Sequence, residues 1–156
     1  MRIVKESIPY ILIPALLAIG AGAFGFWYVS AFLIVVALFM AFFFRHPKRV
    51  PPTDSDVVVS PADGRVTRIE PQNEGTCISI FLSPLDVHIN RSPIPGKIVD
   101  MLYSRGKFLI ATNEQASLVN EQNALTIQGE KITVVCKQIA GILARRIVVW
   151  KRAGDS

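Results

Sequence analysis

The chain has 156 residues and a formal net charge of +5 at pH 7, and this length allows one compact domain plus an appendage. The first 52 residues hold five basic residues and one acidic residue, and the rest of the sequence adds a net charge of only +1. The excess charge therefore flanks an apolar block, as in membrane proteins, and forms no basic stripe with interleaved aromatics. We expect no nucleic-acid partner.

The apolar block covers residues 8–44, which carry no charge. As one straight helix these residues would span about 55 Å, well beyond a hydrocarbon core of roughly 30 Å. Glycines and alanines at 20–25 break the block into two apolar arms, with Trp27 and Tyr28 beside the break. Because both outer flanks are basic and the break is uncharged, the pattern favours a transmembrane helical hairpin with both ends on the cytoplasmic side.

Two alternatives to this hairpin stay open. One is a single long, tilted span across the membrane. The other is a secretory signal peptide, since a basic start and small residues at 21–23 are both present. Cleavage at that point would leave the second apolar arm on the mature protein, which argues against the signal peptide.

The composition of the sequence changes after Arg45, where the apolar block gives way to prolines and short β-branched runs. Pro47, Pro51 and Pro52 predict a stiff linker, so we place a membrane anchor at residues 1–46 and a β-rich domain at residues 47–156. Beyond the linker, short β-branched runs alternate with turn residues, which predicts a mostly β fold of the barrel or sandwich kind. The expected strands are 57–60, 65–69, 76–82, 86–90, 97–103, 124–128, 131–139 and 146–150.

The two cysteines, Cys77 and Cys136, lie in apolar alternating runs and belong to no close pair of Cys or His residues. This spacing makes a zinc site improbable, and no metal site is expected elsewhere. Buried free thiols are the simplest interpretation of both residues.

Candidate catalytic residues occur in two polar segments between turn formers. Asp63 lies in Ser-Pro-Ala-Asp-Gly at 60–64, and His88 lies in the polar segment 82–93. A carboxylate and an imidazole on a β scaffold suit proton transfer near neutral pH. Singly, each signal is weak, because Asp-Gly is a common turn pair and a lone histidine is often structural. Arg91 and Lys107 are candidates for binding the phosphate or carboxylate of a substrate.

Taken together and in order, these segments resemble the phosphatidylserine decarboxylase family in its short, membrane-associated form. Two hydrophobic arms before the first motif are also typical of that family. The most specific segments are those around His88 and around Gln138. The resemblance is carried by residues 43–49, 60–64, 81–91, 106–108, 120–121 and 138–147.

The resemblance implies a pyruvoyl enzyme that converts phosphatidylserine to phosphatidylethanolamine through a Schiff base between the pyruvoyl carbonyl and the substrate amine. In that family the precursor cuts itself at a Gly-Ser bond near its C-terminus, and the serine becomes the pyruvoyl group. His88 matches the family histidine linked to decarboxylation, and Asp63 matches the aspartate associated with self-processing.

Two departures from the family pattern limit this comparison. Some long members have a second histidine three residues after the first, whereas this sequence has Arg91, which leaves the processing base open. The sequence also contains no Gly-Ser dipeptide and ends at Ser156 within an expected turn. We therefore expect a truncated precursor that is inactive by itself. Its pyruvoyl serine would belong to a separate polypeptide that follows Ser156 in the precursor and acts as its partner.

The expected location is the cell membrane, with the β domain on the cytoplasmic side. Arg45, Lys48 and Arg49 would each add about 1 kcal/mol of attraction to anionic lipid, and phosphatidylserine is itself anionic. The sequence allows a homo-oligomer but does not specify one. Two other functions remain open: a non-catalytic membrane-anchored β-barrel module for binding or as an adaptor, and an inactive relative of the enzyme.

Overall fold

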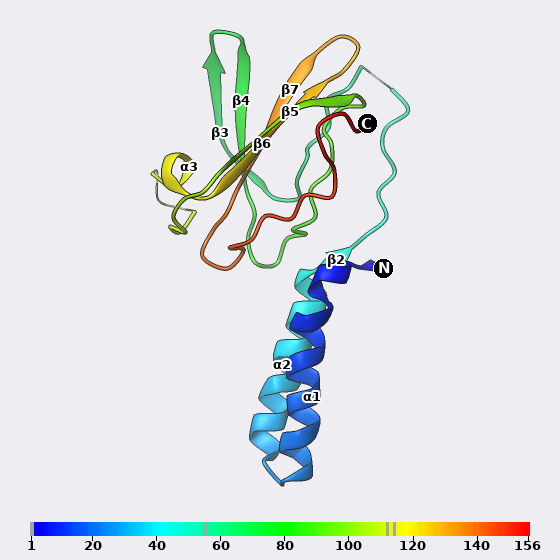
Figure 1. Cartoon of the computed structure of the whole chain (residues 1–156), viewed down its shortest axis with the longest axis vertical. Helices are drawn as coiled ribbons and strands as arrows, with labels where there is room; N and C mark the ends of the chain where they lie inside the picture. The colour runs from blue at the N-terminus through cyan, green and yellow to red at the C-terminus, as the bar shows by residue number, and fades with distance from the viewer. Residues whose placement is uncertain (1, 55, 112, 114) are drawn as a thin grey trace. The chain divides into compact units, whose positions relative to one another are not determined.

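A computed structural model describes residues 2–54, 56–111, 113 and 115–156. It divides the protein into two compact units, the first made of Met1–Val50 with Ala62–Asn90 and the second of Pro51–Pro61 with Arg91–Ser156. The first unit holds β1 (Arg2–Ile3), the 3-10 helix η1 (Lys5–Ser7), α1 (Ile8–Ala23), α2 (Trp27–Phe43), β2 (Arg45–His46), β3 (Arg65–Gln72) and β4 (Gly75–Phe81). The second holds β5 (Lys97–Ser104), α3 (Ala116–Val119), β6 (Gln122–Gln128) and β7 (Thr133–Ile139) (Figure 1).

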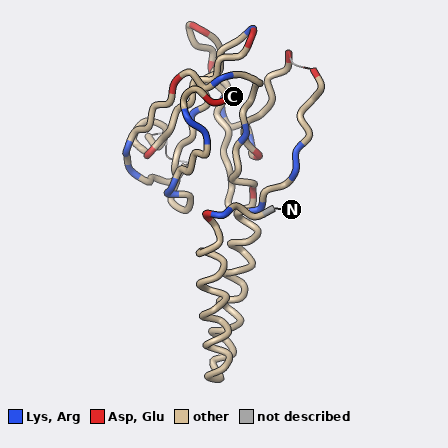
Figure 2. Tube along the Cα trace, turned by 45° about the vertical axis from the view of Figure 1, so that its right-hand side comes forward, with Lys and Arg blue, Asp and Glu red and all other residues tan. Residues whose placement is uncertain are grey.

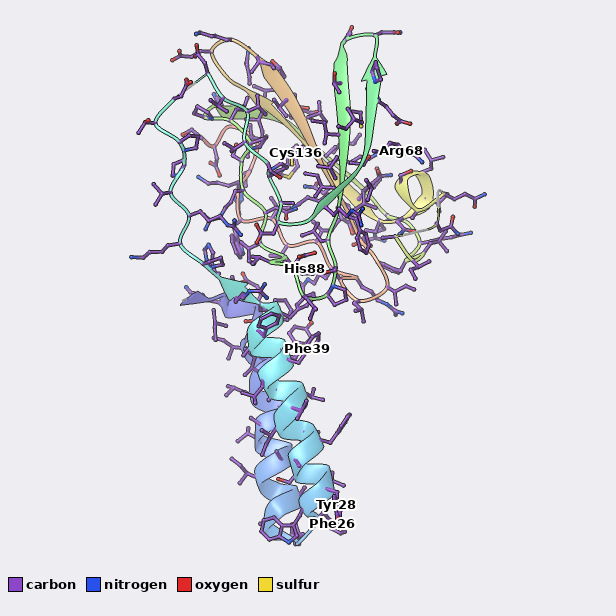
Figure 3. All side chains as sticks on the ribbon, turned by 180° about the vertical axis from the view of Figure 1, so that it is seen from behind. Phe26, Tyr28, Phe39, Arg68, His88 and Cys136 are labelled. Carbon is purple, nitrogen blue, oxygen red and sulfur yellow. The ribbon has the colours of Figure 1, made fainter. Side chains whose placement is uncertain are left out.

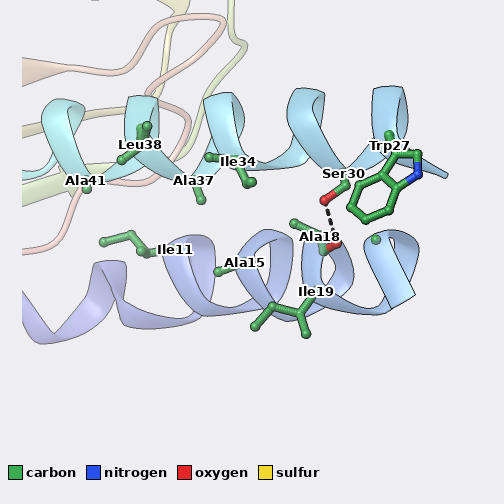
Figure 4. Close-up of a pocket in the computed structure, with 11 residues that line it drawn as sticks. Ile11, Ala15, Ala18, Ile19, Trp27, Ser30, Ile34, Ala37, Leu38 and Ala41 are labelled. Atoms are coloured by element: carbon green, nitrogen blue, oxygen red, sulfur yellow. Dashed lines mark hydrogen bonds between the residues drawn. The ribbon is translucent and has the colours of Figure 1, made fainter. Parts of the chain in front are cut away.

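Helices α1 and α2 pack side by side in the first unit. Gly25 makes the tight connection between them by adopting a φ of 80°, which glycine accepts without steric cost. The Ser30 hydroxyl donates a hydrogen bond of 2.8 Å to the Ala18 carbonyl and so joins the two helices (Figure 4). A groove of about 590 Å³ runs along the pair, and its many small side chains let the two backbones approach closely.

The two helices are apolar on nearly every face. Figure 2 shows no lysine, arginine, aspartate or glutamate along them. Among the described helices, only Lys5–Ala23, with 19 residues and a mean hydropathy of 1.5, is long and apolar enough to cross a membrane; α2 has 17 residues. This one segment is consistent with membrane association. That both helices span a membrane stays a prediction, as does the side on which they end.

Strands β3 and β4 form an antiparallel ribbon in the first unit. Pairing runs from Arg65 opposite Phe81 to Gln72 opposite Gly75. An irregularity between Val66 and Arg68 adds one residue to β3, as a β-bulge does. The ribbon confirms the strands predicted at 65–69 and 76–82, although β3 extends three residues further.

The second unit is built on an antiparallel sheet in the order β5-β6-β7. Its core consists of Ile94, Ile98 and Ile127, with Leu125, Val134 and Cys136 packed against them. Alternation along each strand puts all of these side chains except that of Ile94, which precedes β5, on one face. Burying each such aliphatic side chain stabilises the fold by about 1.5–3 kcal/mol. The predicted strands at 97–103, 124–128 and 131–139 are confirmed, with shifts of a few residues at their ends.

Three other predicted strands are wrong. Residues 57–60, 86–90 and 146–150 are β-branched but join no ladder. Val59 donates its N–H to the Pro93 carbonyl in a single contact, and Asp86 donates its N–H to the Ser83 carbonyl within a turn. A β-branched run becomes a strand only when a partner edge accepts its hydrogen bonds.

The protein is thus mixed α/β, with a β-rich part after the helices. This part contains the β3–β4 ribbon and the three-stranded sheet, and a further pair joins the two-residue strands β1 and β2. Closure of the strands into a barrel or sandwich stays a prediction.

Candidate active site

A hydrogen-bonded turn at residues 83–86 prepares the position of His88. Asp86 donates its N–H to the Ser83 carbonyl at 2.9 Å, and Ser83 donates its N–H to the Asp86 carboxylate at 2.6 Å. Pro84 suits the second position of such a turn because its φ is already fixed. The hydrogen bonds from Ser83, helped by the charges of His88 and Arg45, lower the pKa of Asp86 from its ordinary value. This carboxylate is therefore ionised at neutral pH.

The His88 imidazole is held on two sides. Its Nδ1 lies 3.0 Å from the Asp86 carbonyl oxygen, and because a carbonyl can only accept, Nδ1 carries the proton. Nε2 then carries the lone pair and is the atom that can accept a proton. The ring stacks on Phe43, with centroids 4.0 Å apart and an interplanar angle of 27°. Figure 3 shows His88 beside the end of α2.

Burial is the main reason that the pKa of His88 is lowered from its ordinary value. Arg45 adds to this effect, whereas the hydrogen bond to the Asp86 carbonyl and the Asp86 charge oppose it. The net result is a neutral imidazole at pH 7. In this state His88 is a proton acceptor first and a proton donor only after it has been protonated.

Arg45, two residues beyond α2, binds the same turn. Its guanidinium donates to the Leu85 carbonyl at 2.7 Å and to the Phe42 carbonyl at 3.0 Å. The guanidinium also lies 3.9 Å from the centre of the Phe42 ring, as a cation–π contact. Arg45 therefore ties the end of α2 to the residue that precedes Asp86.

Asp63 forms an ion pair with Arg49, and their side chains are 34% and 43% exposed. At this exposure the pair contributes little to stability, about 0–1 kcal/mol, but it orients the carboxylate. Gly64 follows Asp63 because a Cβ there would overlap the Phe81 carbonyl oxygen. An open depression of about 560 Å³ lies here, lined by Asp63, Gly64, Arg65, Phe81, Ser83 and Asp86.

The two predicted catalytic residues both belong to the first unit. Asp63 and His88 share no hydrogen bond within the described residues, but Asp86 is next to both of them. Its side chain lines the depression together with Asp63, and its carbonyl holds His88. Of the side chains that the structure describes, no three His, Cys, Asp or Glu gather as metal ligands would.

The two predicted substrate-binding residues, Arg91 and Lys107, belong to the second unit, and both are exposed. Arg91 donates its N–H to the Pro61 carbonyl at 2.9 Å. Lys107 donates its N–H to the Val119 carbonyl at 2.8 Å and accepts from the Glu121 N–H at 3.0 Å. These bonds fix the backbone of both residues.

A buried asparagine supports the Lys107 segment. Asn120 is 1% exposed, and its side chain makes three hydrogen bonds: it accepts from the Leu109 N–H at 2.8 Å and donates to the carbonyls of Leu109 and Ala140 at 2.9 Å. Beside it, a Cβ on Gly106 would overlap the Val119 carbonyl. Close backbone packing therefore accounts for Gly106, and the three side-chain bonds account for Asn120.

Sequence reasoning missed Asp86, Phe43 and the specific partners of Arg45 and Arg49. Asp86 had a local signal, since Ser-Pro-x-Asp is a turn pattern placed two residues before the histidine. Phe43 and Arg45 had none, because Arg45 binds Leu85 across 40 positions of sequence. Contacts of this length depend on how the polypeptide folds back.

Comparison with known proteins places the chain in a family. Residues 36–156 match the family model described as phosphatidylserine decarboxylase. A protein named phosphatidylserine decarboxylase proenzyme from Solibacter usitatus is 46% identical over 159 residues, which cover 99% of this chain and 76% of the relative. Proteins of the same name from Geotalea uraniireducens and Geobacter sulfurreducens are 42% and 41% identical, over 98% of this chain and 75% and 76% of the relatives.

Decarboxylase proenzymes are thus the class of protein that the chain matches along nearly its whole length. The chain belongs to the phosphatidylserine decarboxylase family. This confirms the resemblance drawn from the motifs.

Proposed function

We propose that the protein decarboxylates phosphatidylserine to phosphatidylethanolamine, the reaction that the names of its relatives indicate for them. One observation carries the proposal: the identity of 46% to a decarboxylase proenzyme extends over 99% of the chain. It therefore covers both candidate catalytic segments as well as the anchor.

The depression beside Asp63 supports this substrate class. Its lining holds two carboxylates, Asp63 and Asp86, and one guanidinium, Arg65. The serine headgroup carries an ammonium, a carboxylate and a phosphate, so both signs of charge find partners here. Arg91 and Lys107 are further proposed contacts for the anionic groups of the lipid.

A pyruvoyl group is the proposed cofactor. It would supply an electrophilic carbonyl for condensation with the substrate amine, and the adduct would provide a sink for the electron pair left by carbon dioxide. The first unit fits an amine substrate delivered to such a group. Asn90 Oδ1 is buried and has no hydrogen-bond partner in the described part of the chain, and His88 Nε2 carries a lone pair. Two acceptors in one segment suit an ammonium group that has to be held and deprotonated.

Within this proposal His88 moves the proton and Asp63 assists self-processing. Neutral His88 accepts a proton at Nε2 and returns it to the product carbon, while Nδ1 stays bound to the Asp86 carbonyl. Asp63, oriented by Arg49, is available to the processing reaction as a carboxylate.

We further propose that residues 1–46 anchor a β-rich domain of residues 47–156 in the cell membrane, as a hairpin with both ends in the cytoplasm. Lys48 is the clean test of lipid attraction, because Arg45 and Arg49 have intramolecular partners. Lys48→Gln should weaken the binding of anionic lipid by the membrane-inserted protein about fivefold, equivalent to about 1 kcal/mol. Unchanged binding would contradict this part of the proposal.

The activity is tested on protein expressed from its own gene, with phosphatidylserine labelled at the carboxyl carbon in mixed micelles. We expect release of labelled carbon dioxide, inactivation by borohydride in the presence of substrate, and loss of roughly 10²–10⁴-fold in rate in His88→Ala. His46→Ala is the matched control, since His46 is the other histidine of the sequence. No release from the wild type would favour a binding module or an inactive relative.

A further inference from the structure

The closest ring–ring contact described in the structure joins the end of α2 to the candidate catalytic histidine. The ring centroids of Phe43 and His88 are 4.0 Å apart, whereas the phenylalanine and tyrosine pairs lie 5.0–6.1 Å apart. Phe43 is the last residue of α2 and is 8% exposed. The Phe43 side of the contact is therefore buried, and it is provided by the helix and not by a strand.

This stacking and the hydrogen bond at Nδ1 constrain the imidazole in complementary ways. Stacking on Phe43, at an interplanar angle of 27°, restricts the plane of the ring. The bond from Nδ1 to the Asp86 carbonyl fixes the rotation of the ring within that plane. Together they determine the direction in which the Nε2 lone pair points, which is the property that proton transfer depends on.

Arg45 holds the turn that carries the carbonyl. Its guanidinium binds the Leu85 carbonyl at 2.7 Å, one residue before Asp86, while also bonding to the last turn of α2 through Phe42. Phe43 and Arg45 thus reach the histidine from the same helix end, one through its ring and the other through its turn.

We propose that the end of α2 is a positioning element for catalysis, in which Phe43 orients the His88 imidazole and Arg45 holds its supporting turn. This inference rests on the proposed function. It gives the apolar helix pair a second role, because an anchor that only tethers the protein to lipid would not need to contact the histidine. Phe43 and Arg45 act through His88 and are positioning residues.

The test compares three phenylalanine variants of the full-length protein in detergent micelles, where membrane tethering plays no part. Phe43→Leu keeps an apolar side chain but removes the aromatic face, and Phe43→Tyr keeps the face. Phe32→Leu makes the same change in α2, eleven residues and about 16 Å away along the helix. The His88 signal in nitrogen-labelled protein is assigned by its loss in His88→Gln.

We expect Phe43→Leu to raise the midpoint of the His88 titration, because the ring loses the burial that lowers its pKa while Asp86 and Arg45 still face it. We also expect kcat to fall by about tenfold or more with KM within about twofold, since small misplacements can cost roughly 10²-fold. Phe43→Tyr and Phe32→Leu should match the wild type in both measurements.

Two outcomes would overturn the proposal. One is a Phe43→Leu protein with an unchanged His88 titration, even if its activity falls, because a purely structural loss would leave the imidazole as it was. The other is a raised titration midpoint with unchanged kcat. If the wild type releases no carbon dioxide, the proposed function fails, but the titration still reports whether Phe43 orients and buries the ring.

Discussion

Replacing Asn120 by alanine should destabilise the second unit strongly. The side chain is 1% exposed and makes three hydrogen bonds with backbone groups of Leu109 and Ala140. Each bond contributes a net of about 0.5–1.5 kcal/mol, and the substitution deprives the buried Ala140 carbonyl and the partly buried Leu109 groups of this partner. Three bonds therefore predict a loss of about 3–4 kcal/mol, a large part of the 5–15 kcal/mol typical of whole domains.

The assay is urea unfolding of the protein in micelles, followed by fluorescence. In a Trp27→Phe background, the fluorescence of Trp150 reports on the second unit, to which this residue belongs. With a urea dependence of about 1–3 kcal/mol per molar, the expected loss moves the midpoint down by about 1–4 M. The slope should stay the same if stability alone has changed.

Asn113→Ala is the matched control for this prediction. Asn113 is exposed, and its side chain accepts one hydrogen bond, from the Gln115 N–H at 2.9 Å. A loss of about 0.5–1 kcal/mol is expected there. Should Asn120→Ala lower the midpoint no more than Asn113→Ala does, the reasoning from buried hydrogen bonds would be refuted. The larger effect would also displace the backbone of Lys107, which pairs with Asn120.

Other predictions concern packing, protonation and thiol reactivity. Gly64→Ala should cost about 1–3 kcal/mol, because its Cβ would overlap the Phe81 carbonyl, whereas Gly141→Ala meets nothing within 4 Å and should be neutral in urea unfolding. Since the pKa of His88 is lowered in the folded state, the unfolded protein binds more protons, so the unfolding free energy should fall as pH drops below about 6.5 and level off below the folded pKa. A pH-independent contribution in a comparison with His88→Gln would contradict this. Burial raises the pKa of Cys136, so iodoacetamide should alkylate it more slowly in the folded protein than in urea, measured by mass spectrometry; equal rates would exclude a buried thiol.

Periodicity predicted the regular elements well where a single face is apolar. Strands β5, β6 and β7 follow from alternating side chains, and that alternation reflects the core around Ile98 and Ile127. The same pattern failed at 86–90 and 146–150, where β-branched residues occur without a neighbouring edge. Strand propensity is local, but pairing is a property of two segments.

The motifs, in turn, pointed to Asp63 and His88 from their order along the sequence, and the family match followed from the same segments. Their side-chain chemistry was readable because carboxylates and imidazoles have few roles near neutral pH. The identity of the family and the apolar character of residues 8–44 were thus determined by the sequence itself.

Only the tertiary structure decided how these residues are held. Burial lowers the pKa of His88, and the Asp86 carbonyl selects which ring nitrogen carries the proton. Arg45, which precedes the linker, binds the Leu85 carbonyl 40 positions later in the sequence. Such effects depend on distance and desolvation in space, and a one-dimensional pattern contains neither until the polypeptide has folded back on itself.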